Sequence, residues 1–571
     1  MDALRSRAQD WVHHDPDPET RRAGQALLDA DDREALADHF DGNLRFGTAG
    51  MRGALGPGPR RMNRAVVLRV GSGLARYALK TLPEVRSRGA VVGYDARHGS
   101  RTFAEDTARV FAAAGIPVSL FEDAGPTPCL AHALVYLGAA IGVMVTASHN
   151  PAGDNGYKVY WSNGAQIIPP HDEGISGAVA WGGPLPELPG LEALQGEGLV
   201  QAPHPTAWTD YLDRVLALRV HTETGVRAVY TALHGVGGDV VVRVLRAAGH
   251  EDVHPVAAQQ TPDGDFPTLR FPNPEEPGVM DLALAQAEAC GADLVIANDP
   301  DADRLAVALP DASGQWGMLT GDEVGVLLAE DLLSHGPQGP NRMVATTIVS
   351  STLLRRIAAA HGAVCAETLT GFKWIAARAI AHDGPFLIGY EEALGYTIGD
   401  VVRDKDGVSA ALLLLDLAAW AKSRGETLHD RLAAIYRQHG VHRTRQVSVR
   451  MEGDAGAARI AALTETMRQE PPRSVAGAKV LRVQDISAGT DTDLLSGAVG
   501  PVDLPRADVI ALYLDDGSRV VVRPSGTEPK IKLYFEAVVP VEPGGTIAAA
   551  QGHADARIDQ LAADLRARMG I

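Results

Sequence analysis

The sequence predicts an α/β protein of several domains, with a strand-rich domain at its C-terminal end. Its 571 residues exceed what one hydrophobic core can fill, which favours about three to five domains. Between residues 90 and 389, short apolar runs alternate with segments of helical periodicity. This strand–helix alternation is typical of sheets covered by helices on both faces. The last quarter of the chain instead shows several strand patterns and one closing helix at 546–568.

The expected elements fall into three alternating sets and one strand-rich set. Residues 1–40 are expected to form amphipathic helices, and the apolar stretch 410–420, which contains Asp416, predicts a buried helix too short for a bilayer. The Pro/Gly/Glu-rich stretch 182–205 predicts a loop or boundary. Strands are expected at 90–95, 116–121, 141–146, 226–231, 293–297, 343–348, 364–367, 385–389, 447–451, 480–483, 509–514 and 531–538. Helices are expected between them at 101–114, 128–137, 240–248, 282–289, 351–361 and 373–381.

Composition narrows the class of protein. A net charge of −18 argues against general binding to nucleic acid and against docking on anionic membranes. Apolar residues make up 45% of the chain and charged residues 22%, as in globular proteins. The three cysteines, Cys129, Cys290 and Cys365, lie far apart and form no disulfide pattern. With no signal-peptide pattern at the N-terminus, we expect a cytoplasmic location.

A serine follows the third predicted strand. The strand 141–146 runs into Thr146-Ala147-Ser148-His149-Asn150-Pro151, whose small and polar residues and proline end it. Open α/β sheets bind their ligands at the carboxyl ends of strands, so Ser148 is a candidate functional hydroxyl. The alternative is an ordinary turn after a core strand.

Three carboxylates at alternate positions follow the strand 293–297, in Asp299-Pro300-Asp301-Ala302-Asp303-Arg304. Such oxygens can converge on a hard cation such as Mg²⁺. The run is not an EF-hand, because Arg304 stands where that loop needs glycine. The alternative is an acidic surface turn.

Two further segments suit a phosphorylated, hydroxyl-rich ligand. Arg523-Pro524-Ser525-Gly526-Thr527-Glu528-Pro529-Lys530 combines an arginine fork with hydroxyls and glycine, which suits a phosphate. Gly389-Tyr390-Glu391-Glu392-Ala393-Leu394-Gly395 offers paired carboxylates as acceptors for hydroxyl groups. Taken alone, the first could be a turn between strands, and the second a solvated loop.

Taken in their order along the chain, the four segments resemble the motifs of the α-D-phosphohexomutase (phosphoglucomutase/phosphomannomutase) family. Details such as Asn155–Tyr160, Gly371–Trp374 and Lys405–Ser409 are most similar to the subgroup that includes phosphopentomutase and glucose-1,6-bisphosphate synthase. The resemblance implies four domains around a central cleft, three of them α/β with mixed sheets and the last α+β. The implied boundaries are 1–206 with the phosphoserine loop, 207–322 with the metal loop, 323–443 with the sugar loop and 444–571 with the phosphate loop.

The resemblance also implies a reaction: a phosphoryl group moves between position 1 and position 6 of a hexose, or position 5 of a pentose. Phosphorylated Ser148 would be the donor and would bind Mg²⁺ together with Asp299, Asp301 and Asp303. Lys158 is the candidate general base, with Arg52, Arg304 and His149 beside the reacting groups. A sugar bisphosphate would be the intermediate and activator, and a hinged fourth domain would allow it to turn over.

The residues expected to bind the rest of the sugar phosphate lie in the later motifs. The distal phosphate is assigned to Arg523, Ser525, Gly526 and Thr527, and the sugar to Glu391, Ala393, Lys373 and Lys405. Ala393 stands where the family often carries serine, so the preferred sugar stays open among glucose, mannose, ribose and deoxyribose phosphates. We expect a monomer or a small homo-oligomer.

Two other functions fit parts of the sequence. Asp299-Pro300-Asp301 after a strand also resembles haloacid-dehalogenase-type phosphotransferases, in which the first aspartate is the nucleophile. That assignment leaves Ser148 without a role. The other alternative is a non-catalytic phosphosugar-binding protein.

Overall fold

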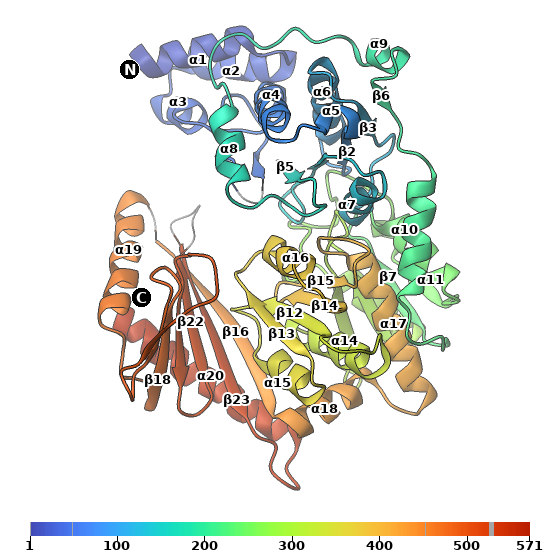
Figure 1. Cartoon of the computed structure of the whole chain (residues 1–571), viewed down its shortest axis with the longest axis vertical. Coiled ribbons are helices and arrows are strands. Elements are labelled where there is room, and N and C mark those ends of the chain that lie inside the picture. Colours follow the sequence, from blue (N-terminus) through green and yellow to red (C-terminus); the bar gives the residue numbers. More distant parts are fainter. Residues whose placement is uncertain (1, 48–49, 452, 525–529, 571) are drawn as a thin grey trace. The chain divides into compact units, whose positions relative to one another are not determined.

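The computed structural model describes residues 2–47, 50–451, 453–524 and 530–570 (Figure 1). The chain divides into two compact units. Unit 1 contains residues 1–319 and 394–423, and unit 2 contains residues 320–393 and 424–571.

Three short helices begin unit 1, as the sequence predicts. They are α1 (Asp2–His14), α2 (Pro18–Ala30) and α3 (Arg33–Phe40). The Asp17 carboxylate caps α2 and the Asp32 carboxylate caps α3, because each accepts a backbone N–H of the first turn. Trp11, Leu28 and Phe40 bury the apolar faces of these helices in the first core of the unit.

The first sheet of unit 1 has six strands in the order β1-β5-β4-β2-β3-β6. Strands β2, β3, β4 and β6 run parallel, whereas β5 pairs antiparallel with β4 and β1 pairs antiparallel with β5, so the sheet is mixed. Helices α6 and α7 pack against β2 and β4 and lie on opposite sides of the sheet in Figure 1. The strands are β1 (Met51–Ala54), β2 (Ala90–Tyr94), β3 (Val118–Leu120), β4 (Ile141–Val145), β5 (Asp154–Tyr160) and β6 (Val200–Gln201). The helices are α4 (Arg64–Thr81), α5 (Val85–Arg88), α6 (Ser100–Ala113), α7 (Thr127–Tyr136), α8 (His171–Ala178) and α9 (Leu191–Gly196).

The second sheet of unit 1 has the order β11-β10-β9-β7-β8. It is also mixed, because β7 pairs in parallel with β8 and β9, while β10 is antiparallel to β9 and β11. Its strands are β7 (Ala228–Thr231), β8 (Val253–Pro255), β9 (Leu294–Ala297), β10 (Ala306–Pro310) and β11 (Trp316–Met318). The helices of this part are α10 (Thr206–Ala217), α11 (Gly238–Ala247), α12 (Ala257–Gln260) and α13 (Asp281–Cys290).

Residues 394–423 return to unit 1 and supply β15 (Gly395–Ile398) and α17 (Gly407–Ser423). Helix α17 is buried from Gly407 to Ala421, which confirms the predicted buried helix. It packs against α11 and β15, so its apolar residues are covered all round.

Unit 2 begins with a parallel arrangement of three strands, in which β12 (Met343–Thr347) pairs with β13 (Val364–Thr368) and with β14 (Phe386–Glu391). Met343, Ala345, Ala366, Phe372 and Ile375 form the core between these strands and α16. The helices are α14 (Gly321–His335), α15 (Leu353–Ala360), α16 (Phe372–Ile380) and α18 (Leu428–His439).

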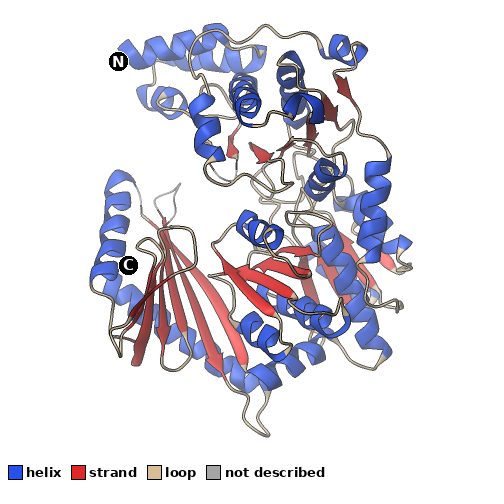
Figure 2. Cartoon of the chain, in the orientation of Figure 1, coloured by secondary structure: helices blue, strands red, loops and turns tan. Residues whose placement is uncertain are grey.

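The end of unit 2 is an antiparallel sheet backed by two helices (Figure 2). The strand order is β16-β23-β22-β21-β18-β19-β20, with β17 paired to β18. The strands are β16 (Val441–Arg450), β17 (Ser474–Val475), β18 (Ala478–Asp485), β19 (Thr490–Asp493), β20 (Val499–Pro501), β21 (Ile510–Leu514), β22 (Arg519–Pro524) and β23 (Lys530–Val539). Helix α19 (Gly453–Gln469) packs against β22 and β23, and helix α20 (Ile547–Met569) against β16 and β23. The predicted class, α/β with mixed sheets followed by an α+β domain, is confirmed.

The stretch 182–205 differs from the prediction. It contains α9 and β6 rather than loop alone, because Leu194 and Val200 bury their side chains in the first core. In the described part of the chain, none of the helices is both long and apolar enough to span a bilayer.

Candidate active site

The loop after β4 presents Ser148 in a strained backbone conformation. Ser148 has φ +51°, in the left-handed region that non-glycine residues rarely adopt. Its N–H donates to Thr146 Oγ1 at 2.9 Å. The Ser148 hydroxyl donates to Asp299 Oδ2 at 2.7 Å and lies 3.2 Å from His149 Nδ1. The candidate hydroxyl and the first residue of the acidic motif are therefore in direct contact.

The side chain of Arg97 stabilises this loop through hydrogen bonds to its backbone. The guanidinium is buried, lies 3.3 Å from the Asp95 carboxylate and stacks 4.9 Å from the centre of the Phe266 ring. Its terminal nitrogens donate to four backbone carbonyls of the loop, those of Ser148, Asn150, Pro151 and Asp154. Arg97 belongs to none of the motifs recognised in the sequence. A usable signal was its place just after the strand 90–95, since β2 is the parallel neighbour of β4.

The three aspartates of the acidic motif cluster in the turn between β9 and β10. Asp299, Asp301 and Asp303 are fully buried, and one oxygen from each lies within 4.8 Å of the others. Asp301 also accepts hydrogen bonds from the N–H and the hydroxyl of Thr127. Asp301 Oδ1 and Asp303 Oδ1 accept no hydrogen bond from any described residue. Buried carboxylate oxygens without a hydrogen-bond donor suit a hard divalent cation.

The pKa values of Asp299 and Asp303 are shifted in opposite directions. Burial, together with the charges of Asp303 and Asp301, raises the pKa of Asp299 to about 7. Burial also opposes the charge of Asp303, but the cations of Lys158, Lys405 and Arg304 outweigh it and hold the pKa of Asp303 well below its usual range.

Two lysines supply the cations nearest the acidic cluster. Lys158, on β5, donates from Nζ to Asp301 Oδ2 at 2.6 Å and to Asp303 Oδ2 at 2.8 Å. Lys405 also donates to Asp303 Oδ2. Burial opposes the ammonium of Lys158, yet the neighbouring aspartates outweigh it and raise the pKa of Lys158 above its usual value.

The loop that carries Lys405 is tied to β5. The Asp404 carboxylate accepts the hydroxyl of Tyr160 and the amide of Gln166, each at 2.7 Å, and the N–H of Lys405 at 2.8 Å. Tyr160 is two residues beyond Lys158 on the same strand and is fully buried. Both lysines are thus positioned from one strand.

Three further predicted residues lie around the same cluster. Arg52, exposed on β1, donates to Asn150 Oδ1 at 2.8 Å, and the N–H of Arg304 donates to Asp299 Oδ1 at 3.0 Å. Partial burial and the charges of Arg304 and Arg52 lower the pKa of His149 well below its ordinary value. Unit 1 therefore brings together Ser148, His149, Lys158, Arg52, Arg304, Lys405 and the three aspartates.

The remaining predicted residues belong to unit 2. Glu391 Oε1, at the end of β14, accepts the N–H of Gly371 at 2.8 Å, and Lys373 follows Gly371 in the first turn of α16. Ala393 closes the segment that carries Glu391 and Glu392. Arg523 lies near the end of β22. Ser525, Gly526 and Thr527 fall outside the described residues.

The geometry of unit 1 defines a class of enzyme. A serine hydroxyl in contact with clustered acids, surrounded by lysines and arginines, is suited to metal-assisted transfer of a phosphoryl group. The cations would neutralise the transferring oxygens, while the acids would hold the metal.

Comparison with known proteins defines the family. Four regions match the family domains described as phosphoglucomutase/phosphomannomutase, alpha/beta/alpha domain I (residues 43–182), domain II (208–314), domain III (320–439) and C-terminal domain (449–554). The chain is 40% identical to a probable phosphomannomutase of Haemophilus influenzae, with 83% of this chain and 93% of the relative covered. It is 37% identical to phosphopentomutase of Homo sapiens, with 93% of this chain and 90% of the relative covered.

A solved structure shows the same fold. Parafusin, a phosphoglucomutase of Paramecium, superposes with a TM-score of 0.68 at 20% identity, covering 92% of this chain and 96% of that one. The chain belongs to the phosphoglucomutase/phosphomannomutase family. It is an enzyme of the intramolecular phosphotransferase class, which confirms the predicted phosphosugar mutase activity.

Proposed function

We propose that the protein moves a phosphoryl group between position 1 of a sugar and position 6 of a hexose, or position 5 of a pentose, through phosphorylated Ser148. The contact of the Ser148 hydroxyl with Asp299, at 2.7 Å within the acidic cluster, is the observation that carries this proposal. It puts the phosphoryl-carrying atom next to the groups that would neutralise the transferring charge.

The residues present fit a magnesium ion. Asp299, Asp301, Asp303 and a phosphoserine oxygen at Ser148 would hold it, and the oxygens that lack donors, on Asp301 and Asp303, are available ligands. Bound there, Mg²⁺ would supply charge neutralisation on the transferring phosphoryl group. Arg304 and Lys405 would add fixed positive charge from the protein itself.

Lys158 is our proposed general base for the attacking sugar hydroxyl. In the structure its ammonium donates hydrogen bonds to Asp301 and Asp303, whose charges raise the pKa of Lys158. Proton acceptance by Lys158 therefore requires that these carboxylates be engaged by another cation. Arg52 would stabilise charge nearby. His149, kept neutral by its lowered pKa, can hydrogen-bond to the Ser148 oxygen.

The sugar phosphate itself would be held from unit 2. Arg523, Ser525, Gly526 and Thr527 are proposed for the distal phosphate, and Glu391, Ala393 and Lys373, with Lys405, for the sugar. The names of the relatives favour both hexose and pentose phosphates as candidates. A sugar bisphosphate would serve as intermediate and activator. The domain boundaries after residues 206, 322 and 443 stay predictions, as do a cytoplasmic location, the absence of nucleic-acid and membrane partners, and a monomer or small homo-oligomer.

The decisive experiment combines turnover with mapping of the phosphorylated residue. With Mg²⁺ and a sugar bisphosphate, the wild-type protein should carry acid-stable phosphate on Ser148, and Ser148→Ala should lose more than about 10³-fold in kcat. Acid-labile phosphate on Asp299 would favour the haloacid-dehalogenase-type mechanism instead. No turnover with glucose, mannose, ribose or deoxyribose 1-phosphate would favour a binding protein.

The same assay identifies the sugar. We propose to compare kcat/KM for hexose and pentose 1-phosphates side by side, because this ratio measures discrimination in the transition state. A ratio near one would mean that the sugar loop does not distinguish ring size.

A further inference from the structure

The two oxygens of the Asp301 carboxylate have different surroundings. Oδ2 accepts the hydroxyl of Thr127 and, at 2.6 Å, the ammonium of Lys158. Oδ1 is also buried and accepts no hydrogen bond from any described residue. The protein therefore engages one oxygen of this carboxylate and leaves the other for a ligand of different chemistry.

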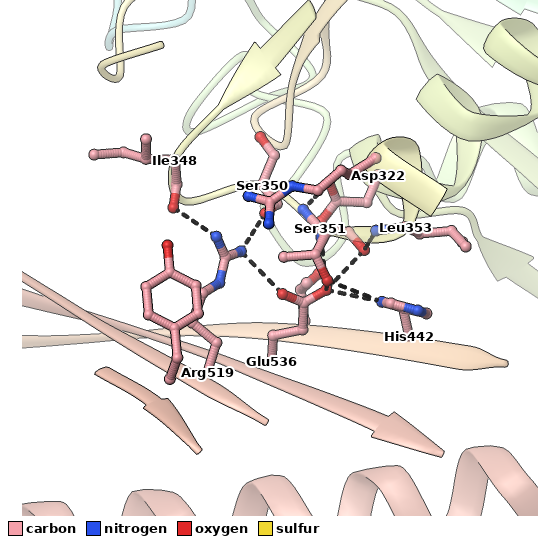
Figure 3. Close-up of polar contacts among 12 residues, drawn as sticks. Asp322, Ile348, Ser350, Ser351, Leu353, His442, Arg519 and Glu536 are labelled. Atoms are coloured by element: carbon pink, nitrogen blue, oxygen red, sulfur yellow. Dashed lines mark hydrogen bonds and ion pairs between the residues drawn. The ribbon is translucent and has the colours of Figure 1, made fainter. Parts of the chain in front are cut away.

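Two buried carboxylates outside the cluster have donors on both oxygens. Figure 3 shows one of them, Asp322, whose Oδ1 accepts the N–H of Ser351 and whose Oδ2 accepts a threonine hydroxyl. The other is Asp416 on α17, which is 1% exposed and accepts two hydrogen bonds from Arg219 at 2.8 Å, one on each oxygen. A buried carboxylate oxygen without a donor is costly unless a cation contacts it, so Oδ1 of Asp301 is suited to a metal ion.

Thr127 contacts Asp301 through its backbone as well as its side chain. It is the first residue of α7 and is fully buried. Its N–H donates to the carbonyl oxygen of Asp301 at 2.9 Å, while its hydroxyl donates to Oδ2. Threonine is β-branched and has few side-chain rotamers, so the backbone contact also restricts the direction of the hydroxyl. Thr127 is thus built to hold Oδ2 in one place.

Asp303 shows the same division between its oxygens. Its Oδ2 accepts the ammonium of Lys158 at 2.8 Å and that of Lys405, and its Oδ1 accepts no hydrogen bond from a described residue. Of the three side chains in the described part of the chain that donate to these two Oδ2 atoms, Thr127 alone is uncharged. Removing its hydroxyl therefore alters the geometry of the cluster without altering its charge.

The number of oxygens that each acid can offer affects which cation fits. A carboxylate with one oxygen engaged by donors can bind a cation only through the other. Mg²⁺ requires near-ideal octahedral geometry at short distances, whereas Ca²⁺ accepts more oxygens, often both from one carboxylate, in flexible geometry. An acid that is restricted to one oxygen therefore favours Mg²⁺ over Ca²⁺.

We propose that Thr127 is a positioning residue that restricts Asp301 to one metal-facing oxygen and thereby favours Mg²⁺ over Ca²⁺. The inference rests on the proposed function, in which the three aspartates hold a divalent cation. Thr127 acts through Asp301 and does not touch the ion. Without its hydroxyl, the carboxylate can turn and offer both oxygens, which weakens the geometry that Mg²⁺ requires and costs Ca²⁺ little.

The variants separate this role from a general effect on folding. Thr127→Val removes the hydroxyl but keeps the branched shape and the N–H that donates to Asp301; Thr127→Ala serves where valine prevents folding, and Thr127→Ser restores the hydroxyl. Thr107→Val is the matched control, because Thr107 on α6 is also fully buried but donates to the carbonyl of Phe103 at 2.7 Å. Asp416→Asn is a second control, which weakens folding away from the cluster.

Calorimetric titration of the full-length, unphosphorylated protein with Mg²⁺ and, separately, with Ca²⁺ at the same pH measures both Kd values without turnover. For Thr127→Val, we expect the Kd for Mg²⁺ to rise about tenfold and the Kd for Ca²⁺ to change less than about threefold. The preference for Mg²⁺, which is the ratio of the two Kd values, should therefore fall. Thr127→Ser, Thr107→Val and Asp416→Asn should keep the ratio of the wild-type protein.

Three results would overturn the inference while leaving the proposed function intact. The first is an unchanged Kd for Mg²⁺ in Thr127→Val and Thr127→Ala. The second is an equal rise in both Kd values, which would mean that the cluster as a whole is disturbed. The third is an equal loss of Mg²⁺ preference in Thr107→Val. If the wild-type protein binds neither ion, the metal site of the proposed function fails first, and the inference fails with it.

Discussion

At the scale of single residues, the backbone of Ser148 is held in place by a side chain from another loop. A left-handed serine costs on the order of 1 kcal/mol or more and persists only where its surroundings enforce it. Arg97 supplies that constraint through the carbonyls of Ser148, Asn150, Pro151 and Asp154. The direction of the Ser148 hydroxyl toward Asp299 thus depends on a guanidinium whose hydrogen bonds go to the backbone of the loop.

Arg97→Lys should therefore lower kcat by about 10- to 100-fold with little change in KM, because a lysine cannot serve four carbonyls and a displaced nucleophile reacts slowly. Arg69→Lys is the matched control. Arg69 is also buried, donates to the carbonyls of Ala180, Gly182 and Gly183, and stacks on Trp11, but it holds no site residue. Steady-state kinetics give kcat and KM for both variants, and thermal unfolding gives their stability. An equal loss of kcat in Arg69→Lys would show that Arg97 matters for folding alone.

A second residue-scale prediction concerns protons and metal at Asp299. Its pKa, raised to about 7 by burial and by Asp303 and Asp301, means that a proton competes for this carboxylate below neutral pH. The Kd of the unphosphorylated protein for Mg²⁺ should rise about tenfold for each unit that the pH falls below 7, and should level off above about pH 8. Calorimetric titration with Mg²⁺ measures this. Asp299→Asn should bind more weakly and lose the pH dependence, so a wild-type Kd independent of pH would contradict the assignment.

The sequence indicates the residues that we propose to react, but not the residues that position them. Ser148 and the three aspartates stand at the ends of apolar strand patterns, where residue type and place both indicate chemistry. Arg97, Thr127 and Tyr160 act through contacts between segments distant in sequence, which no local pattern reveals. The ion pairing of Lys158 with Asp301 and Asp303 is likewise a product of tertiary packing.

At the scale of elements, the regular alternation of strands and helices could be predicted from the sequence, whereas strands with an irregular residue pattern could not. β2, α6 and β4 appear within one or two residues of the predicted bounds, because both strands are buried throughout and α6 is buried along one periodic face. β5 was missed because Asp154, Asn155 and Gly156 begin it, and these residues disfavour strands in isolation. Pairing with β4 and β1 overrides that preference and brings Lys158 to the site.

The N-terminus of α14 gives an element-scale prediction on stability. Asp322, in its first turn, accepts the N–H of Ser351 and the hydroxyl of Thr444, each at 2.8 Å. Burial raises the pKa of Asp322 from 3.8 to about 7, so the folded state binds this proton more tightly than the unfolded state. The associated stability is fully present below the ordinary pKa and is lost as pH rises through 7.

We therefore expect the free energy of unfolding of unit 2 to fall by up to a few kcal/mol between pH 5 and pH 8. Asp322→Asn keeps an acceptor oxygen and removes the ionisable group, so its stability should depend less on pH in this range. Denaturant unfolding at both pH values makes the comparison. A variant as pH-dependent as the wild type would assign the effect to other groups.

At the scale of the whole molecule, the division into two compact units separates the proposed metal ligands from the proposed phosphate-binding residues. Ser148, Asp299, Asp301 and Asp303 all belong to unit 1, whereas Glu391 and Arg523 belong to unit 2. Each unit has its own buried cores. A ligand that binds only the folded form of one unit stabilises that unit by mass action.

Calorimetric unfolding should accordingly show two transitions, and Mg²⁺ should raise the midpoint temperature of only one of them. At a free concentration about 100 times its Kd, the ion adds about 2.7 kcal/mol to the unit that binds it, which is unit 1. Asp301→Asn should abolish this rise in midpoint temperature, because it removes a ligand from the cluster. Asp416→Asn should lower the midpoint temperature of the unit 1 transition, but Mg²⁺ should still raise it. Proteolysis during heating assigns each transition by the fragments that survive it. A single transition whose midpoint temperature rises with Mg²⁺ would show that the two units unfold together. A rise confined to the transition of unit 2 would contradict the assignment of the metal site to the three aspartates.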